Sequence, residues 1–266
     1  MHRMLTTVLL AGVIVSTALC ADGDFQWQGQ LTPGQLLAIR GLNGSIHAEG
    51  TSGSTASVTA HKTGAVSDPG SVNVKVVPYD GGVVICAIYP DTGSSHPNTC
   101  NPPGMDTYLS ANNNDVQVEF SVKVPQGVLL AAHTLTGDVQ ATSLTAHVDA
   151  STLTGNITIS TARSAQATTL HGSIGAAIGT TLWTGVQRFD AGQGNLDLQI
   201  PADANTDVRA TAFRGAIISD FPLDVTSTRE GISTMASGTL GTGGRLLKLS
   251  TFNGNITLHK GPASGQ

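Results

Sequence analysis

Four aspartates are the residues whose type and spacing could support catalysis. Asp138 and Asp149 fall in neighbouring copies of a short repeated motif, and Asp190 and Asp197 flank a weaker copy. Two carboxylates about 5–10 Å apart can cleave a glycosidic bond as an acid and a base or nucleophile. However, the residue after the motif glycine is Asp in one copy and Asn, Ser or Ala in others. Solvated turn residues explain this better, so the sequence predicts no catalytic residue.

Four histidines also fall in repeat segments, namely His47, His133, His147 and His171. Two histidines on neighbouring strands could hold a metal, but zinc sites take further Cys, Asp or Glu ligands. No such residue recurs at a fixed spacing beside these histidines. We therefore expect exposed strand histidines, with no metal and no cofactor.

Residues 192–197 resemble the calcium-binding nonapeptide repeat, in which glycines are followed by an aspartate. The aspartate, Asp197, comes one position late, and the motif occurs once. Calcium needs six to eight oxygen ligands, which such motifs supply only when copies stack. The segment therefore predicts no calcium site.

An apolar–x–Gly–x–apolar motif recurs along the chain. From Gly137 the motif glycines lie 18, 17, 22 and 21 residues apart, and the last gap is 39, about two further periods. A period near 20 residues is typical of stacked β-rungs. It predicts an all-β fold, a β-solenoid or right-handed β-helix-like stack of ~20-residue rungs. The motif glycines are Gly44, Gly137, Gly155, Gly172, Gly215 and Gly254, with Gly194 in a degraded copy.

Each motif glycine is expected to turn the chain, either at positive φ or where a Cβ would clash with the next rung. The apolar pair and the glycine persist from copy to copy, which suits packing and turning. The residue after the glycine varies, from Asp138 to Asn255, and chemistry would have to sit there. The motif therefore indicates a scaffold rather than an enzyme.

The chain divides into a signal peptide at 1–21, an N-terminal β part at 22–125 and solenoid repeats at 126–262. Within the second part, residues 91–115 are rich in Pro, Gly and Asn and read as a long loop. Such loops are often functional, although a stapled insertion without a role is the alternative. Residues 229–244 have lost the motif and are expected to leave the coil.

The N-terminus reads as an export signal. Residues 4–19 are uncharged and mostly apolar, too short for a typical membrane span, and small residues precede a plausible cleavage after Cys20 or Ala21. In the alternative interpretation Cys20 is a lipidated first residue, although the bulky Leu19 disfavours it. No later stretch predicts a transmembrane segment. We expect an exported protein of the periplasm, the cell envelope or the extracellular space.

Cys86 and Cys100 are the two cysteines beyond the signal. Exported chains usually pair such cysteines. A bridge across this 14-residue separation would add about 3 kcal/mol through loop closure. We expect a disulfide that staples the long loop.

Threonines dominate the outward positions that the repeat predicts. Stacked hydroxyl and amide groups on a flat face could bind glycans or other sheets, or could be a neutral solvated face. The set comprises Thr136, Thr152, Thr154, Thr158 and Thr161, with Asn156.

The formal net charge is −5, and only 12% of residues are charged. The charges are scattered, and no Lys/Arg cluster in the sequence indicates nucleic acid or an anionic membrane as a partner. Hydrophobic residues still make up 39% of the chain, which is not a disordered composition.

Five short strings occur in a fixed order along the chain. They lie at 84–90, 115–120, 124–128, 241–244 and 249–256. Together they resemble the "putative adhesin" family of bacterial exported proteins, over about residues 35–260. The resemblance implies a β-solenoid at the cell envelope and favours binding over catalysis. It brings no catalytic residues.

The favoured hypothesis is an exported, non-enzymatic β-solenoid, an adhesin or envelope binding module whose partner is a cell-surface glycan or envelope protein. One alternative is a polysaccharide-active β-helix enzyme, which needs two carboxylates on one face. The other is a structural envelope protein that self-assembles through exposed strand edges.

Overall fold

The computed structural model describes residues 24–91, 96–227 and 232–264. The predicted signal peptide at 1–21 and the alternative lipid site at Cys20 lie outside these residues. Within them, no helix is long and apolar enough to cross a membrane.

The described chain forms two large mixed β-sheets, and neither sheet closes into a barrel. Besides the strands it contains one short 3-10 turn, η1 (Pro69–Ser71). Sheet A has ten strands, in spatial order β1 (Asp24–Gln30), β4 (Thr55–Thr63), β7 (Gln117–Pro125), β3 (Ile46–Thr51), β9 (Val139–Leu144), β11 (Ile157–Thr161), β13 (Ile174–Ile178), β15 (Leu196–Pro201), β21 (Ile256–Gly261) and β17 (Ile217–Ser219).

Sheet B has eleven strands in the described chain. In spatial order they are β18 (Asp224–Ser227), β19 (Thr234–Leu240), β16 (Thr206–Arg214), β20 (Leu246–Asn253), β14 (Gln187–Gln193), β12 (Ala165–His171), β10 (Val148–Thr154), β8 (Leu129–His133), β2 (Leu36–Arg40), β6 (Gly82–Ile88) and β5 (Asn73–Tyr79). The all-β prediction is confirmed, and the finer prediction of a right-handed β-helix-like solenoid stays a prediction.

The strands follow from alternation in the sequence. In β7, Val118, Phe120 and Val122 are buried, while the residues between them are half-buried or exposed. Successive side chains of a strand point to opposite faces, so one face of each sheet is apolar. The two apolar faces meet in one continuous core, in which Phe120 and Phe189 are among the largest buried side chains.

From β8 to β15, successive strands alternate between the two sheets and pair in parallel with their counterparts in the next repeat. Strand β10 pairs with β8 and β12, and β11 pairs with β9 and β13. The register sets Ile157 beside Val139 and Ile174, each of them the last residue of its motif. Equivalent positions of the motif therefore form columns across the strands.

The order of the columns departs from the order of the sequence in two places. Strands β2 and β3 lie between β6 and β8 and between β7 and β9, respectively. Near the other end, β20 and β21 insert between β14 and β16 and between β15 and β17. The 39-residue gap from Gly215 to Gly254 therefore does not add two further parallel layers, because the last copy of the motif returns to an inner place.

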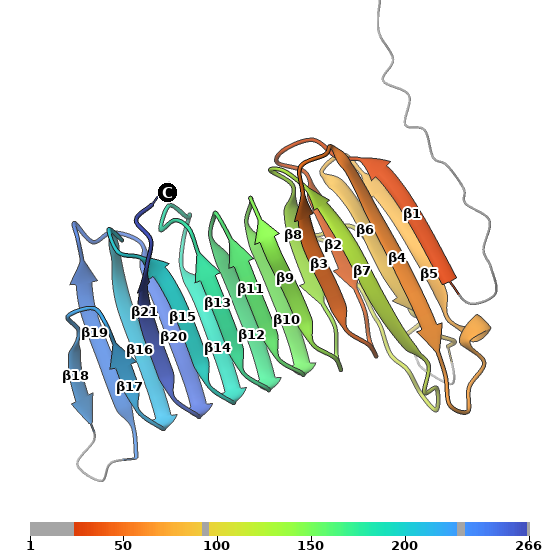
Figure 1. Ribbon diagram of the computed structural model, residues 1–266. Helices are drawn as coiled ribbons and strands as arrows, with labels where there is room; N and C mark the ends of the chain where they lie inside the picture. The colour runs from red at the N-terminus through yellow and green to blue at the C-terminus, as the bar shows by residue number, and fades with distance from the viewer. Residues whose placement is uncertain (1–23, 92–95, 228–231, 265–266) are drawn as a thin grey trace, which may run out of the picture.

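Antiparallel strands close both ends of the elongated body, as Figure 1 shows. Strands β1, β4, β5 and β6 lie at one end, and β18 and β19 at the other. Strand β19 lies within the segment expected to leave the coil, and it pairs antiparallel with β16 and β18. The boundary predicted at residue 125 stays a prediction. Strands β2 and β3 precede it and pair with β8 and β9, which follow it.

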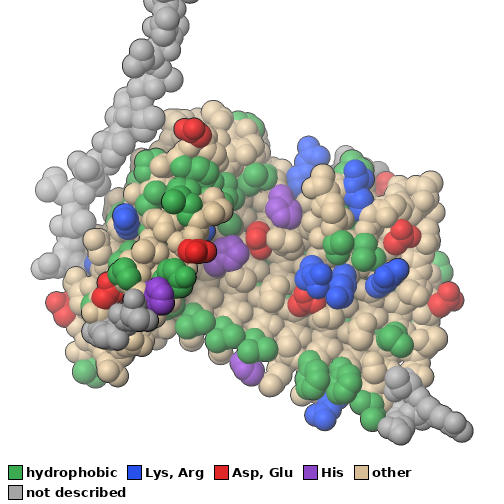
Figure 2. All heavy atoms as spheres, turned by 180° about the vertical axis from the view of Figure 1, so that it is seen from behind, with side chains coloured by type: hydrophobic (Ala, Val, Ile, Leu, Met, Phe, Trp, Pro, Cys, Tyr) green, Lys and Arg blue, Asp and Glu red, His purple; other side chains and the backbone are tan. Residues whose placement is uncertain are grey.

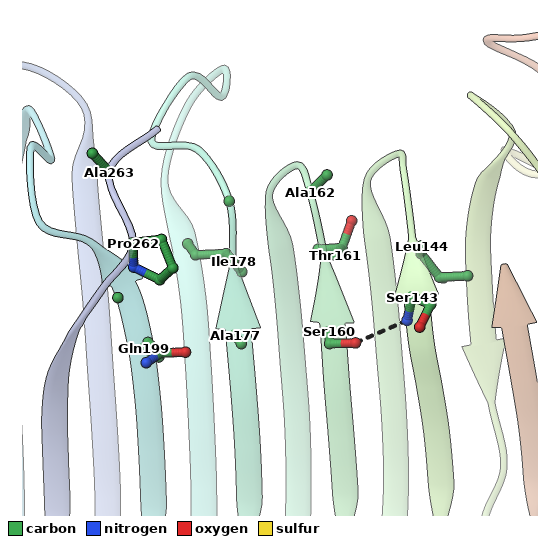
Figure 3. A pocket seen from close by; sticks show the side chains of 12 residues that line it. Ser143, Leu144, Ser160, Thr161, Ala162, Ala177, Ile178, Gln199, Pro262 and Ala263 are labelled. Carbon is green, nitrogen blue, oxygen red and sulfur yellow. Dashed lines mark hydrogen bonds between the residues drawn. The ribbon is translucent and has the colours of Figure 1, made fainter. Parts of the chain in front are cut away.

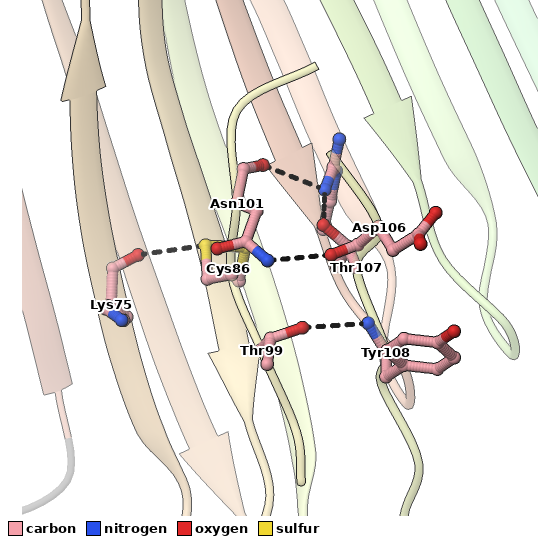
Figure 4. The surroundings of a disulfide bond; sticks show 9 residues. Lys75, Cys86, Thr99, Asn101, Asp106, Thr107 and Tyr108 are labelled. Carbon is pink, nitrogen blue, oxygen red and sulfur yellow. Dashed lines mark hydrogen bonds between the residues drawn. A yellow bond between two sulfur atoms is a disulfide. The ribbon is translucent and has the colours of Figure 1, made fainter. Parts of the chain in front are cut away.

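The predicted disulfide between Cys86 and Cys100 is present, and both cysteines are buried. Around it the loop is held by polar contacts (Figure 4): the Nη1 of Arg40 donates to the carbonyl O of Asn101 at 3.1 Å and also to Thr107 Oγ1. Arg40 lies in β2, so the part of the loop around Asn101 and Thr107 lies against sheet B. The bridge therefore joins the loop to the sheet, and residues 92–95 lie outside the described chain.

Candidate functional site

The motif glycines form one column across the molecule. A Cβ built on Gly155 would overlap the backbone carbonyl of Gly137, and Gly155 has φ of 152°, a conformation that favours glycine. Each of the other motif glycines would likewise strike the backbone of its neighbour. In spatial order the column is Gly44, Gly137, Gly155, Gly172, Gly194, Gly254 and Gly215, and Gly215 alone among these lacks a positive φ.

The residue after each glycine carries a hydrogen-bond ladder. The backbone N–H of Asn156 donates to Asp138 Oδ1 at 2.7 Å, and that of Ser173 donates to Asn156 Oδ1 at 2.9 Å. The ladder continues to Ala216, whose N–H donates to Asn255 Oδ1 at 2.8 Å. The position where chemistry would have to sit thus links neighbouring repeats in the described chain. The residues differ, but each one that faces a further unit supplies a side-chain oxygen.

Two of the threonines predicted to face outward are buried. Thr152 and Thr161 point inward, and Thr152 Oγ1 donates to the carbonyl of Gly137 at 3.0 Å. Thr136, Thr154 and Thr158 are exposed, as is Asn156. The predicted single threonine face is thus wrong in part, since the strand alternation divides these residues between the core and the surface.

Sequence reasoning missed a further column, three residues before the glycine. Thr169 Oγ1 donates to the carbonyl of Gly155 at 2.9 Å, and Thr251 Oγ1 donates to that of Gly194 at 2.9 Å. Thr134 Oγ1 donates to the carbonyl of Gly44 at 3.0 Å. The signal was a threonine recurring at one fixed offset from the glycine. These hydroxyls satisfy carbonyls of the glycine column, so they belong to the scaffold.

The four aspartates are divided between the two sheets, and the two that share a face, Asp149 and Asp190, stand on strands separated by β12. Asp190 in β14 lies on the outer face of sheet B, whereas Asp197 in β15 lies on the outer face of sheet A. Asp149 also faces outward from sheet B, and its Oδ2 lies 3.9 Å from the Nε2 of His133. Asp138 belongs to the ladder. The partners of Asp190 are Arg188 at 3.7 Å and the hydroxyl of Ser250.

The four histidines also lie apart. His47 is exposed in sheet A, where its Nδ1 lies 3.1 Å from Gln140 Oε1, and His171 is exposed in β12 of sheet B. His133 and His147 are half-buried, and burial lowers the pKa of both, against an opposing effect of Asp149. The expectation of exposed histidines is therefore wrong for these two. Among the described residues, no group of three or more His, Cys, Asp or Glu is placed to hold a metal.

The segment that resembles a calcium repeat is part of the scaffold. Gly194 stands in the glycine column and Leu196 is buried in the core. The Oδ2 of Asp197 lies 3.6 Å from the Nε2 of His259.

One hollow on the surface lacks acid–base groups. It has a volume of about 450 Å³ and lies where strands of sheet A end, as Figure 3 shows. Its lining includes Ser143, Ser160, Ile178, Gln199 and Pro262, and no titratable side chain.

The first apolar residue of the motif is exposed in most copies, while the second is buried. The prediction that the apolar pair serves packing therefore holds for one member of the pair. The exposed members lie at equivalent positions near the ends of strands of sheet B, with β14 between Leu170 and Phe252, and each is 37–53% exposed. We call them the apolar row: Leu135, Leu153, Leu170, Phe252 and Phe213.

The apolar row is interrupted at β14, where Gly192 occupies its position. The side chain of Leu170 lies against Gly192, which stands between Leu170 and Phe252. The rings of Phe213 and Phe252 are stacked, with centroids 4.8 Å apart and planes inclined by 10°. Figure 2 shows hydrophobic side chains gathered along the lower edge of this side of the molecule. Leu42, in the first copy of the motif, belongs instead to the core.

The outer face of sheet B also carries a row of cations, four residues before the apolar row along the strands. Arg188 pairs in register with Lys248, and Lys248 pairs with Arg209. We call these three residues the basic row, and Figure 2 shows a group of Lys and Arg side chains above the hydrophobic edge. The scattered charges of the sequence thus do form a cluster, because β20 inserts between β14 and β16.

Comparisons with known proteins give few matches. No family model and no curated protein match the chain. One similar solved structure is a putative cell adhesion protein from Clostridium sporogenes, with 11% identity and a TM-score of 0.42, covering 90% of this chain and 100% of that one. Another is a putative adhesin from Bacteroides fragilis, with 10% identity and a TM-score of 0.35, covering 90% and 98%.

At this level of likeness, neither structure establishes the family or the activity of this chain. Function therefore has to be argued from its own residues.

Proposed function

We propose that the protein is an exported, non-enzymatic β-solenoid, an adhesin or cell-envelope binding module. Its binding surface is the outer face of sheet B. The apolar row is the observation that carries the proposal, because it exposes five large apolar side chains in the same position of the motif, three leucines on one side of Gly192 and two phenylalanines on the other. Single exposed apolar residues are ordinary on a protein surface, whereas contiguous ones mark interaction sites.

The solenoid part of the proposal is supported by the three columns. The glycines, the side-chain oxygens after them and the threonines before them each link one repeat to the next. Repeats that contact only their neighbours are the physical basis of a solenoid. A stack of this kind presents equivalent side chains at strand spacing, about 4.8 Å, which suits an extended partner.

The absence of enzyme activity is favoured by how the carboxylates are used. Asp138 accepts a backbone hydrogen bond, and Asp190 contacts Arg188 and Ser250. A glycosidase needs two carboxylates across one bond, but Asp190 and Asp197 face away from opposite sheets. Asp149 and Asp190 share the outer face of sheet B, but β12 and two residues of register separate them. The exposed apolar row offers contact area, and adhesion requires no more than that.

The open part of sheet B begins where the disulfide loop ends. The loop contacts β2 through Arg40, and Met105, Thr107 and Leu109 line a hollow with Leu135. Beyond Leu135 the apolar row is exposed. The partner is thus expected to lie across β10, β12, β14, β20 and β16, and its class is a cell-surface glycan or an envelope protein.

The test is retention of the purified protein on insoluble cell-wall polysaccharide and on a washed envelope fraction. The variant carries Leu153→Gln and Phe252→Gln, and the control carries Val66→Gln and Val225→Gln, which alter exposed apolar residues elsewhere. We expect the variant to lose at least tenfold in retention and the control to match the wild type. Equal losses in both, or no retention of the wild-type protein on either material, would contradict the proposal.

A further inference from the structure

We infer that the basic row, Arg188, Lys248 and Arg209, binds an acidic polysaccharide whose chain runs across strands β14, β20 and β16. The inference deepens the proposed function and rests on it, because it names the partner class of the same face. It depends on side chains that are far apart in the sequence and adjacent in the sheet.

The register fixes the geometry of the basic row. The residues on either side of each cation along its strand are buried, for example Phe189 after Arg188 and Leu249 after Lys248. The cations therefore point outward together, Arg188 and Arg209 exposed and Lys248 half-buried. With neighbouring strands about 4.8 Å apart, the three strands bring the cations within roughly 10 Å along the sheet.

The arrangement is not balanced within the protein. Like charges directly opposite on neighbouring strands destabilise a sheet. Asp190 lies 3.7 Å from Arg188, but Lys248 and Arg209 have no ion pair within 4.0 Å among the described residues. The nearby Asp207 accepts instead from Thr239 Oγ1 at 2.7 Å and from a backbone N–H. A chain of net charge −5 thus keeps two cations, Lys248 and Arg209, side by side on one face without an ion pair in the described part of the chain.

The neighbouring side chains favour a sugar polymer. Ser250 and Thr211 follow Lys248 and Arg209 by two residues on the same face, and hydroxyl groups donate to and accept from sugar hydroxyls. Phe252 and Phe213 follow two residues later, about 13 Å from the cations along the strand. An acidic polysaccharide combines acidic groups, hydroxyls and apolar ring faces, which these three rows match.

The same face is less suited to a single-stranded nucleic acid. Such partners stack their bases on aromatic side chains along a positively charged groove. Here the rings of Phe213 and Phe252 are stacked on one another, and the carboxylates of Asp190 and Asp207 lie beside the cations on the same strands. A polymer with a lower charge density than a phosphate backbone fits this mixture of signs better.

The probes are polygalacturonate, fully methyl-esterified polygalacturonate, a single-stranded oligothymidine and phosphatidylglycerol vesicles, with binding measured by biolayer interferometry. We expect polygalacturonate to bind at least tenfold tighter than its neutral ester and tighter than the other two probes. The variant Lys248→Gln with Arg209→Gln should weaken binding at least fivefold, and added salt should weaken wild-type binding. The control Lys75→Gln with Lys123→Gln makes the same charge change elsewhere and should stay within twofold.

Equal affinity for the acidic polymer and its ester overturns the inference, as does equal weakening by both variants. Tighter binding to the oligonucleotide or the vesicles also overturns it. If the wild-type protein is retained on envelope material but shows no preference for acid, the inference fails and the proposed function stands. If it is retained on nothing, the proposed function fails as well. Thermal midpoints within a few degrees of the wild type show that the variants are folded.

Discussion

The backbone N–H of Ala216 donates to Asn255 Oδ1 at 2.8 Å, although Asn255 follows it by 39 residues. This bond records the return of the last copy of the motif to an inner place in the stack. It also explains the alanine: β17 is the last strand of sheet A, so residue 216 has no further unit to support. The same insertion brings Lys248 between Arg188 and Arg209.

The glycine column predicts that substitutions of two glycines differ strongly in how much they lower the free energy of unfolding. Gly155→Ala places a Cβ on the carbonyl of Gly137 at a φ that disfavours alanine, so the strands must separate. We expect a loss of about 3 kcal/mol or more in the free energy of unfolding. Gly175→Ala is the control, because nothing lies within 4 Å of its Cβ. Urea denaturation measures both, and similar losses would contradict the clash.

The ladder predicts that oxygen matters more than residue type. Ser173 Oγ accepts from the N–H of Asn195 at 3.1 Å. Ser173→Ala should cost about 1 kcal/mol by urea denaturation, whereas Ser173→Asn should restore the acceptor and most of the stability. A Ser173→Asn protein as unstable as Ser173→Ala would show that the hydrogen bond is not what the position supplies.

Asp115 predicts an acid-sensitive anchor beside the long loop. Its carboxylate accepts from the backbone N–H of Ser67 at 2.8 Å and from those of Val66 and Ala65, and these bonds lower its pKa from 3.8 to about 2. Because the folded-state pKa is depressed, the stabilisation is present above pH 3.8 and is lost as the pH falls toward 2.

Asp115→Asn should therefore reduce the change in thermal midpoint over that acid range, while lowering the midpoint at neutral pH. The measurement is a series of thermal melts from neutral to acid pH. If the thermal midpoint of the variant fell in acid as much as that of the wild type, Asp115 would be excluded as a source of the pH dependence.

The disulfide predicts a loop-specific stabilisation. Replacing Cys86 and Cys100 together with Ala should cost about 3 kcal/mol, the loop-closure value for a separation of 14 residues. Reductant should destabilise the wild-type protein and leave the double variant unchanged in urea denaturation. A wild-type protein indifferent to reductant would mean that the bridge does not form or does not stabilise.

Much of the scaffold could be predicted from the motif, because a glycine that repeats at a strand–turn–strand period reflects local geometry. Leu153 and Ile157 show the limit of the pattern. Both are apolar and persistent, but alternation places Ile157 in the core and Leu153 on the surface. The sequence alone suggested packing for both.

The basic row could not be predicted, because Arg188, Arg209 and Lys248 are distant in the sequence. Their places beside one another in the sheet depend on β20 inserting between β14 and β16, which no local pattern specifies. The outward position predicted for Thr152 is wrong for a simpler reason. Its hydroxyl has a buried carbonyl partner, so this polar residue can occupy an inward position.

An NMR titration of the ¹⁵N-labelled protein with an oligogalacturonate tests the central claim most directly, since it locates binding on the molecule. The account predicts chemical-shift changes confined to the outer face of sheet B, largest at Arg188, Arg209 and Lys248 and extending to Phe213 and Phe252. Shifts gathered on sheet A, or none at saturating ligand, would contradict it.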